Sequence, residues 1–226
     1  MRVIGFVYML VLVFSCHVVN ASPVKEKRDV SSFNKINASS GIDVRFTQGN
    51  TLSVEVEADT DVLSSIITTV SANTLTIKKE KSFKGRSLKM TVYITAPSLE
   101  ELTLSGGSDF YLDHLDTDRL TINSSGGADS EIGSLKVKST FAINSSGGSD
   151  CDISKLEAQD CELRSSGGSD VDISGLKAAN VKVNASGGSD MKLKGEVKNL
   201  NINVSGGADV HIKELKYDHI ISNQKK

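Results

Sequence analysis

Regularly spaced aspartates are the residues of this 226-residue chain with the clearest potential for chemistry. Each one ends a Ser-Gly-Gly-(Ser/Ala)-Asp motif, and successive aspartates are 20, 21, 20, 20 and 19 residues apart. The six are Asp109, Asp129, Asp150, Asp170, Asp190 and Asp209. Carboxylates repeated in this way could bind Ca²⁺ between neighbouring repeats. They could also accept hydrogen bonds from backbone N–H groups and Ser hydroxyls of their own turns.

The structural role is the preferred interpretation of these aspartates, and calcium is the alternative. Calcium-binding nonapeptide solenoids have a much shorter repeat, and they carry a third glycine that is missing here. We therefore assign no metal ligand and no other cofactor. Calcium binding at the six aspartates is a hypothesis that thermal melting with and without the ion would test.

Catalytic residues are not evident in the sequence. The acid pairs Asp150/Asp152 and Asp170/Asp172 could suggest glycosidase or lyase chemistry, which uses two carboxylates. Because such pairs recur with the repeat, a structural role is favoured. The histidines at 114, 211 and 219 form no recognisable triad. We expect a protein that is not an enzyme, with a carbohydrate-active enzyme as the alternative.

Paired glycines precede every one of these aspartates. A glycine adopts positive φ without the steric penalty that other residues meet, so each pair predicts a sharp corner in the chain. The predicted corner residues are Gly106, Gly107, Gly126, Gly127, Gly147, Gly148, Gly167, Gly168, Gly187, Gly188, Gly206 and Gly207. A weaker relative of the motif, Ser40-Gly41-Ile42-Asp43, stands alone near the beginning of the chain.

Apolar and polar residues alternate on both sides of each corner, as in strands with one buried face. Aligned repeats form apolar columns, one of which reads Leu120, Phe141, Cys161, Val181 and Leu200. A repeat of nearly constant length stacks its columns on those of the next repeat, with strands about 4.8 Å apart. The pattern predicts an all-β, right-handed β-helix-like solenoid of about 20-residue coils over residues 98–220.

The region before the repeats has shorter and less regular strand patterns. Residues 30–97 predict short strands, with a helical turn at Asp59-Thr60-Asp61-Val62-Leu63. We expect this β-rich section to cap the solenoid, because the open end of a solenoid would otherwise pair with other chains. Residues 22–29 are expected to be a linker, and residues 221–226 a polar tail.

The first 21 residues have the parts of a secretory signal. Arg2 is followed by an apolar run from Val3 to Phe14, and a small-residue cleavage pattern ends at Ala21. The run is short for a membrane span, so no transmembrane span is expected after cleavage. An alternative is a lipoprotein with Cys16 as the lipidated residue. Either reading predicts export to the periplasm, the outer membrane or the cell surface.

Composition and cysteine positions bear on the partners of the protein and on whether it has a disulfide. Lys+Arg 26 against Asp+Glu 28 gives no concentrated basic surface, which argues against nucleic acid as a partner. Cys151 and Cys161 both fall in inward columns, where a free cysteine behaves as a small hydrophobe. A disulfide between them is the alternative, since the expected compartment permits one.

The chain resembles the head GIN domain family, which consists of secreted proteins found largely in Bacteroidetes and labelled auto-transporter adhesins. The resemblance lies in the segment from Phe33 to Val56, the Leu75/Ile77 strand, the stretch Tyr93-Ile94-Thr95-Ala96-Pro97-Ser98-Leu99 and the Ser-Gly-Gly-(Ser/Ala)-Asp coils. It covers most of the expected mature chain. The resemblance implies a β-solenoid fold at the envelope or cell surface, and it transfers no catalytic residues.

A polar column gives the only further indication of function. Asn-x-Ser/Thr recurs at Asn37, Asn123, Asn144, Asn184 and Asn203. The repeat itself places four of them, so the column is either a solvated face or a polar binding surface. We expect an exported, adhesin-like binding or scaffold protein, whose partner is an envelope or surface protein or a polysaccharide. A periplasmic structural or stress-related module is a further alternative.

Overall fold

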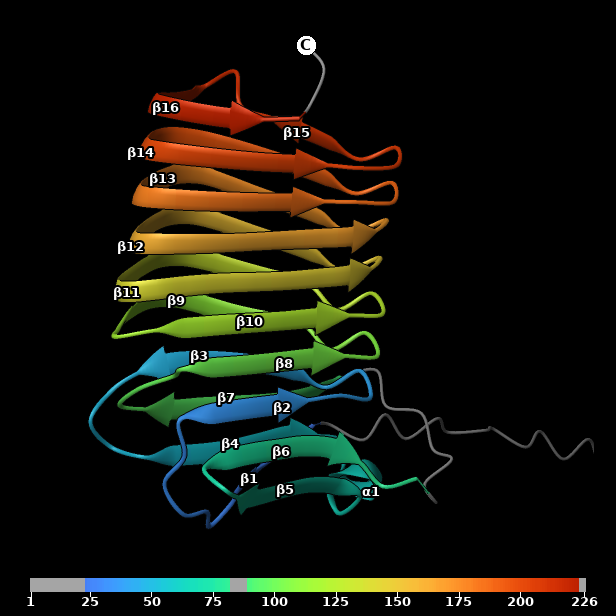
Figure 1. Ribbon diagram of the computed structural model, residues 1–226. Helices are drawn as coiled ribbons and strands as arrows, with labels where there is room; N and C mark the ends of the chain where they lie inside the picture. Colours follow the sequence, from blue (N-terminus) through green and yellow to red (C-terminus); the bar gives the residue numbers. More distant parts are fainter. Residues whose placement is uncertain (1–22, 82–88, 224–226) are drawn as a thin grey trace, which may run out of the picture.

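A computed structural model describes residues 23–81 and 89–223 of the protein. Within these ranges the chain forms one sheet of sixteen strands and one short helix. The coils rise one above another in a right-handed sense (Figure 1), which confirms the predicted solenoid. The predicted leader, including Cys16, and residues 224–226 lie outside the described residues.

The coils of the solenoid consist of parallel strands in register. The strands are β8 (Glu101–Ser105), β9 (Phe110–Thr117), β10 (Leu120–Ser125), β11 (Ser130–Gly147), β12 (Asp150–Gly167), β13 (Asp170–Ala185), β14 (Asp190–Val204), β15 (Asp209–His211) and β16 (Leu215–Ser222). Phe141 lies between Leu120 and Cys161 in the ladder, so the apolar columns of the sequence are stacks in space. Each added coil therefore buries the column below it.

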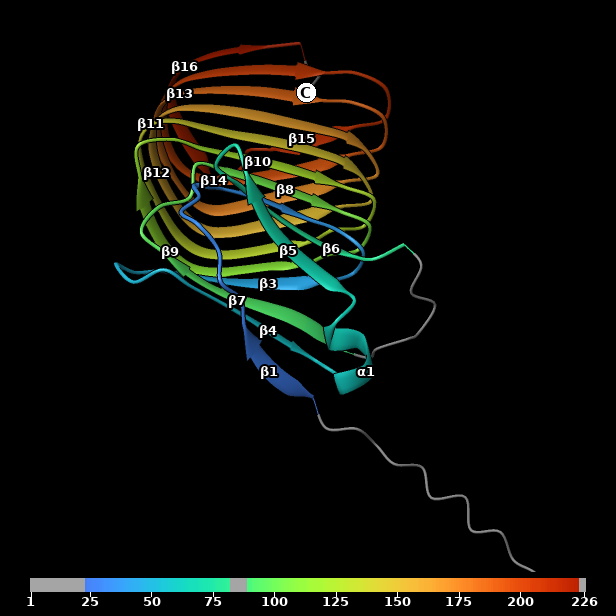
Figure 2. The same cartoon turned by 90° about the horizontal axis from the view of Figure 1, so that it is seen from below.

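Two corners separate an Asn face from an Asp face in each coil, and the alternation within the Asp face is interrupted at residues 133–134, 154–155 and 174–175. The Asn face comprises β8, β10 and residues 140–146, 160–166, 180–185 and 199–204. The Asp face comprises β9 and residues 130–137, 150–158, 170–178 and 190–197. The glycine corner leads from the Asn face to the Asp face, and the far corner, at residues 118–119, 138–139, 159, 179 and 198, leads back. Seen from below, the coils superpose around a common interior (Figure 2).

The core contains two columns that the sequence alternation did not identify. One lies beside the far corner and consists of Thr117, Val137, Ala158, Ala178 and Val197. The other lies inside the glycine corner and consists of Ser108, Ala128, Ser149, Ser169, Ser189 and Ala208, all buried. The fourth residue of the Ser-Gly-Gly-(Ser/Ala)-Asp motif therefore points inward, which explains why it is always small.

The section before residue 98 belongs to the same sheet. Its elements are β1 (Val24–Lys27), β2 (Lys35–Ala38), β3 (Asp43–Gln48), β4 (Ser53–Ala58), α1 (Thr60–Leu63), β5 (Ile66–Ser71), β6 (Thr74–Lys79) and β7 (Met90–Ala96). Strands β2 and β3 pair in parallel with β8 and β9. They form an additional coil whose corner is Ser40-Gly41, both at positive φ. The isolated motif of the sequence is thus a corner of the solenoid.

The lower end is closed by strands that leave the parallel pattern. Strands β6 and β7 continue the parallel ladder below β2 and β3. Strand β5 then pairs antiparallel with β6, β4 with β7, and β1 with β4. In the view from below, β5 crosses the lower end of the coils (Figure 2).

Two predicted boundaries need correction. Residues 24–27 are strand β1 rather than linker, held by backbone pairing to β4 and by an ion pair of 3.6 Å between Lys25 and Glu55. All four of its residues are exposed, so no alternation marked it as a strand. Residues 221 and 222 belong to β16 rather than to a polar tail, because they pair with residues 201 and 202 of β14.

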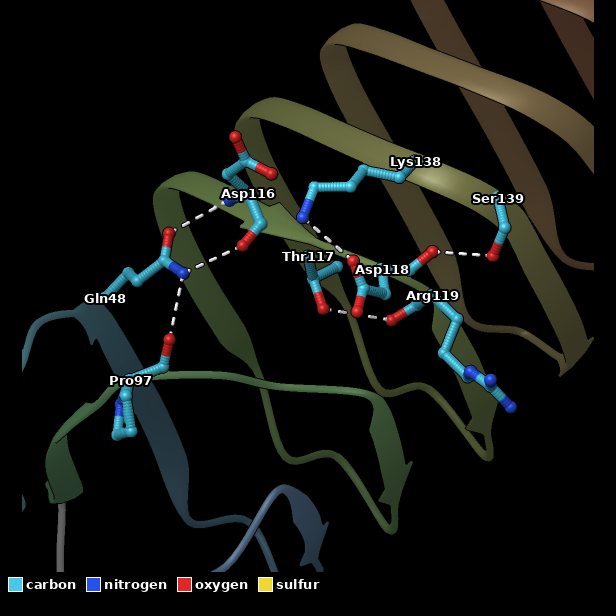
Figure 3. Close-up of polar contacts among 8 residues, drawn as sticks. All are labelled: Gln48, Pro97, Asp116, Thr117, Asp118, Arg119, Lys138 and Ser139. Carbon is cyan, nitrogen blue, oxygen red and sulfur yellow. Dashed lines mark hydrogen bonds and ion pairs between the residues drawn. The ribbon is translucent and has the colours of Figure 1, made fainter.

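A glutamine joins the lower coils at the far corner (Figure 3). The Nε2 group of Gln48 donates to the carbonyl oxygens of Asp116, at 2.8 Å, and of Pro97, at 3.0 Å. Its Oε1 atom accepts a hydrogen bond of 2.9 Å from the Asp116 N–H. One coil higher, Lys138 Nζ lies 2.9 Å from Asp118 Oδ1. These contacts connect successive coils where the strands are interrupted.

Candidate functional site: the outer faces of the solenoid

The glycine corners differ between the two members of each pair. The first glycine has positive φ in all six corners, at Gly106, Gly126, Gly147, Gly167, Gly187 and Gly206. The second has positive φ only at Gly107 and Gly127. The first glycine of every pair therefore has the predicted positive φ. The second glycines from Gly148 onward do not, so their φ does not require glycine.

Inside the corner, pairs of serines satisfy one another. Ser149 Oγ lies 2.8 Å from Ser145 Oγ and accepts a hydrogen bond from the Ser146 N–H. The next coil repeats this arrangement, with 2.7 Å between Ser165 Oγ and Ser169 Oγ. Buried hydroxyls need such partners. The motif serines therefore stabilise the corner from within and do not reach the aspartates outside.

The aspartates lie outside the corners, and the described hydrogen bonds to their carboxylates come from the next coil. The Asp129 N–H donates to Asp109 Oδ1 at 3.3 Å. The Asp150 N–H donates to Asp129 Oδ1 at 3.1 Å. The expectation that the donors lie in the same turn as the carboxylate needs correction for Asp109 and Asp129, because the N–H groups that donate to them belong to the coil above. The column therefore links coils.

A second acidic column stands beside the first on the Asp face. Together they place six carboxylates on three successive coils, namely Asp129, Glu131, Asp150, Asp152, Asp170 and Asp172. Partial burial raises the pKa of Asp150, and the charges of Asp129 and Asp170 raise it further. Burial also raises the pKa of Asp152, with contributions from Asp172 and Asp150. The repulsion between neighbouring carboxylates of the two columns is therefore only partly offset by the hydrogen bonds that they accept.

The Asp face provides no enclosed site in the part of the chain that the structure describes. Its two depressions over the acidic columns are shallow, with volumes of about 240 and 130 Å³. Within residues 23–81 and 89–223, no three His, Cys, Asp or Glu side chains are grouped closely enough to hold a metal ion. His211 Nε2 lies 3.4 Å from Asp190 Oδ1. The acid pairs of the sequence recur along an open surface.

Both cysteines are free thiols in the core. Cys151 stacks between Ser130 and Val171, and Cys161 stacks between Phe141 and Val181, in columns that belong to different faces. Burial raises the pKa of both thiols to about 12. The structure thus has free cysteines that pack as small apolar side chains, rather than the alternative disulfide.

A groove with a volume of about 550 Å³ lies on the Asn face, next to the far corner. It runs across the coils between two outward rows. One row is Thr140, Asp160, Asn180, Asn199 and His219, and the other is Glu162, Lys182, Asn201 and Ile221. We call this feature the Asn-face groove. No repeat in the sequence predicts this groove, because its rows mix amides, charges and apolar side chains.

Hydrogen bonds between coils fix the first row of the Asn-face groove. Asn180 Nδ2 donates to Asp160 Oδ1 at 2.7 Å, and Asn199 Nδ2 donates to Asn180 Oδ1 at 2.8 Å. A similar ladder joins Asn144 to Asn123 at 2.8 Å, outside the groove. An amide in such a ladder keeps a second N–H and further lone pairs for a ligand. The groove therefore presents ordered donors and acceptors.

The fold and its open faces define the class: a β-solenoid with repeated polar side chains on its outer faces. A family model described as "Putative auto-transporter adhesin, head GIN domain" matches residues 32–141 and again 135–224. The chain belongs to this family, as the resemblance in the sequence implied. No curated protein matches the sequence.

Three solved structures have the same fold. A "putative adhesin" from Bacteroides fragilis has 23% identity and a TM-score of 0.70, covering 90% of this chain and 97% of its own. A "putative adhesin" from Parabacteroides merdae has 17% identity and a TM-score of 0.62, covering 91% and 98%. A "putative lipid binding protein" from Parabacteroides distasonis has 14% identity and a TM-score of 0.59, covering 91% and 96%. These likenesses establish the fold.

None of the helices in the described ranges is both long and apolar enough to cross a membrane.

Proposed function

We propose that this protein is exported and works as a non-enzymatic, adhesin-like binding protein at the cell surface. The observation that carries the proposal is the Asn-face groove, an open surface on which polar side chains recur at the spacing of the coils. Family membership and the adhesin names of two solved relatives support it. The secretory pattern of residues 1–21 supports export.

The Asn-face groove suits an extended polar polymer. It is open along the stack, and adjacent coils repeat its amides about every 4.8 Å. Asn180 and Asn199 offer N–H donors and carbonyl acceptors, and Glu162 and Lys182 add one charge of each sign. A polysaccharide or an extended polypeptide meets such a surface with repeated hydrogen bonds. Val181, Leu200 and Ile221 also line the groove, so a ligand meets apolar contacts beside the polar ones.

Binding of the purified protein to immobilised polysaccharides and envelope proteins tests the proposal. The double variant Asn180→Ala/Asn199→Ala removes two adjacent amides of the groove. It should weaken binding of the selected ligand by about tenfold or more, since each buried polar contact contributes roughly 1 kcal/mol. Asn144→Ala removes the same group from the same face outside the groove and should bind as the native protein does.

Equal binding by the double variant and the native protein would exclude the groove as the contact surface. The enzyme alternative has its own test at Asp150 and Asp170. An enzyme using them should lose turnover on a polysaccharide when either becomes Asn, while staying folded. The binding function predicts no turnover by native protein or variants.

A further inference from the structure

The upper end of the solenoid differs from the lower end in having no covering strand among the described residues. Strand β16 pairs with β14 on one side only, and β15 does likewise. The lower end is closed by β5, β4 and β1 (Figure 1). An unpaired strand edge with its backbone N–H and C=O groups is a template for another strand.

Exposed apolar side chains gather on this same strand. Tyr217 and Ile220 are each 39% exposed, and Ile221 is 72% exposed. Tyr217 and Ile220 continue the inward columns of Val197 and Leu200, so they form the uncovered end of the core. Apolar core residues that are left exposed at a strand edge mark a contact surface.

Inward and outward side chains along β16 are arranged symmetrically about the point between residues 218 and 219. Leu215, Tyr217, Ile220 and Ser222 lie in inward columns, because they pair with residues 195, 197, 200 and 202 of β14. Lys216, Asp218, His219 and Ile221 lie in outward ones. The order in-out-in-out then out-in-out-in reads the same in both directions. An antiparallel second copy of β16, centred between residues 218 and 219, therefore places every inward residue opposite an inward one.

We propose that the upper end of the solenoid is an interface between two copies of this chain, joined by antiparallel pairing of β16 with β16 about a two-fold axis. In this register Tyr217 faces Ile220 of the second copy, which covers both exposed core residues. Asp218 faces His219 of the second copy, a complementary pair that occurs twice. An interface of this kind uses the same strand from both copies, as a two-fold dimer requires.

The register makes a charge-specific prediction at Ile221. Its partner in the second copy is Lys216, which points outward and lies 2.9 Å from Glu196 of its own chain. Ile221→Lys places two cations opposite each other at two symmetric positions, whereas Ile221→Glu places an anion opposite each lysine. Because Ile221 is 72% exposed, neither variant disturbs the core of one copy.

Sedimentation of the full exported chain at about 50 µM tests the interface, since a micromolar Kd would leave mostly dimer there. The native protein and Ile221→Glu should be dimers. Ile221→Lys should raise the dissociation constant by about tenfold or more. Circular dichroism melts of the three proteins should agree when extrapolated to low concentration, which shows that each copy remains folded.

A disulfide tests the register itself. The double variant Lys216→Cys/Ile221→Cys should give a covalent dimer under oxidising conditions, and each single variant should remain non-covalent. A native protein that sediments as a monomer would overturn the proposal. Equal effects of Ile221→Lys and Ile221→Glu would also overturn it, as would open-ended filaments, which imply stacking without a two-fold axis.

Discussion

Two of the glycine corners contain a pair of hydrogen-bonded serine hydroxyls, Ser145 with Ser149 and Ser165 with Ser169. Ser169 Oγ bonds to Ser165 Oγ and to the backbone of Ser166. Ser124 occupies the same place as Ser165 in an earlier coil, but it faces Ala128, and its Oγ is buried without a partner. Ser165 and Ser124 therefore allow a comparison between a buried hydroxyl with a hydrogen-bond partner and one without.

Ser169→Ala should destabilise the protein by about 1 kcal/mol, because the Ser166 N–H loses its acceptor and Ser165 Oγ keeps only its bond to the Ser169 carbonyl oxygen. Ala128→Ser should stabilise it by up to about 1 kcal/mol, since it supplies the partner that Ser124 lacks. Urea unfolding of both variants measures the two effects. Opposite signs are expected, and a neutral result for Ser169→Ala would contradict the role assigned to the serine pairs.

Adjacent glycines in one corner should respond differently to the same substitution. Gly167 has φ +77°, and a Cβ there would lie 3.0 Å from backbone atoms of Gly147, whereas a Cβ at Gly168 would meet Gly147 O at an ordinary 3.5 Å. Gly167→Ala should cost about 1–2 kcal/mol or more. Gly168→Ala should be neutral or slightly stabilising, by about 0.5 kcal/mol. Equal melting temperatures for the two variants would contradict this assignment.

Asp152→Asn should stabilise the protein at pH 7 by about 0.5 kcal/mol, a small value because the carboxylate is exposed and screened by solvent. Burial and neighbouring carboxylates raise the pKa of Asp152 in the folded state. The folded state then holds this proton more tightly than the unfolded state, so stability falls as pH rises from the ordinary aspartate range through the raised value. The gain from Asn should disappear below about pH 3.5, where both states are protonated.

Asp160→Asn is the matched control for this charge effect. It removes one negative charge from the same strand but leaves an amide oxygen to accept from Asn180, as Asp160 does at 2.7 Å. It lies on the Asn face, away from the acidic columns. Stability curves from pH 3 to 8 for both variants give the comparison. A larger gain for Asp160→Asn would show that net charge, rather than the acidic columns, sets the effect.

At the scale of elements, the contacts of Gln48 hold the end of β3 against β9, where the chain leaves the coil formed by β2 and β3. Gln48→Leu should cost about 1–2 kcal/mol, because three hydrogen bonds to Asp116 and Pro97 are lost from a half-buried position. Gln159→Leu, an exposed position on the far corner, should leave stability unchanged. Hydrogen exchange should show faster opening of β3 and β9 in Gln48→Leu. Equal exchange in the two variants would contradict the role of Gln48.

Which elements could be predicted depended on whether their side chains followed the repeat. The apolar columns predicted the coils from β8 onward, because burial imposes the same alternation on each of them. Strands β2 and β3 were not predicted as a coil, since residues 49–100 separate them in sequence from β8 and β9, the strands of the next coil. Strand β1 had no buried residue to reveal it. The hydrogen bonds of Gln48 join residues far apart in the sequence, so no local pattern predicts them.

The candidate site was predictable only in part. The Asp column was found from its spacing, but its hydrogen bonds cross to the next coil, which only the register of the stack reveals. The inward serines were overlooked because a polar residue beside glycines is usually a turn residue. The Asn-face groove is built from unlike residues at equivalent positions, so the repeat pattern gave no signal for it.

At the scale of the whole molecule, stacking separates the core from the outer faces. Each coil contacts only its neighbours, so the columns of core residues add stability coil by coil while the outer faces remain free to vary. The Asn-face groove and the Asp face are therefore two different surfaces on one scaffold. A binding role requires that the Asn face be accessible from outside the cell.

Labelling of intact cells tests that requirement most directly. An antibody against the solenoid is suited to this, because a continuous hydrogen-bonded stack resists proteases even where it is exposed. An adhesin-like function predicts labelling of unpermeabilised cells at a level close to that of permeabilised cells. Labelling that appears only after the outer membrane is opened would place the protein in the periplasm and would contradict an adhesin-like function.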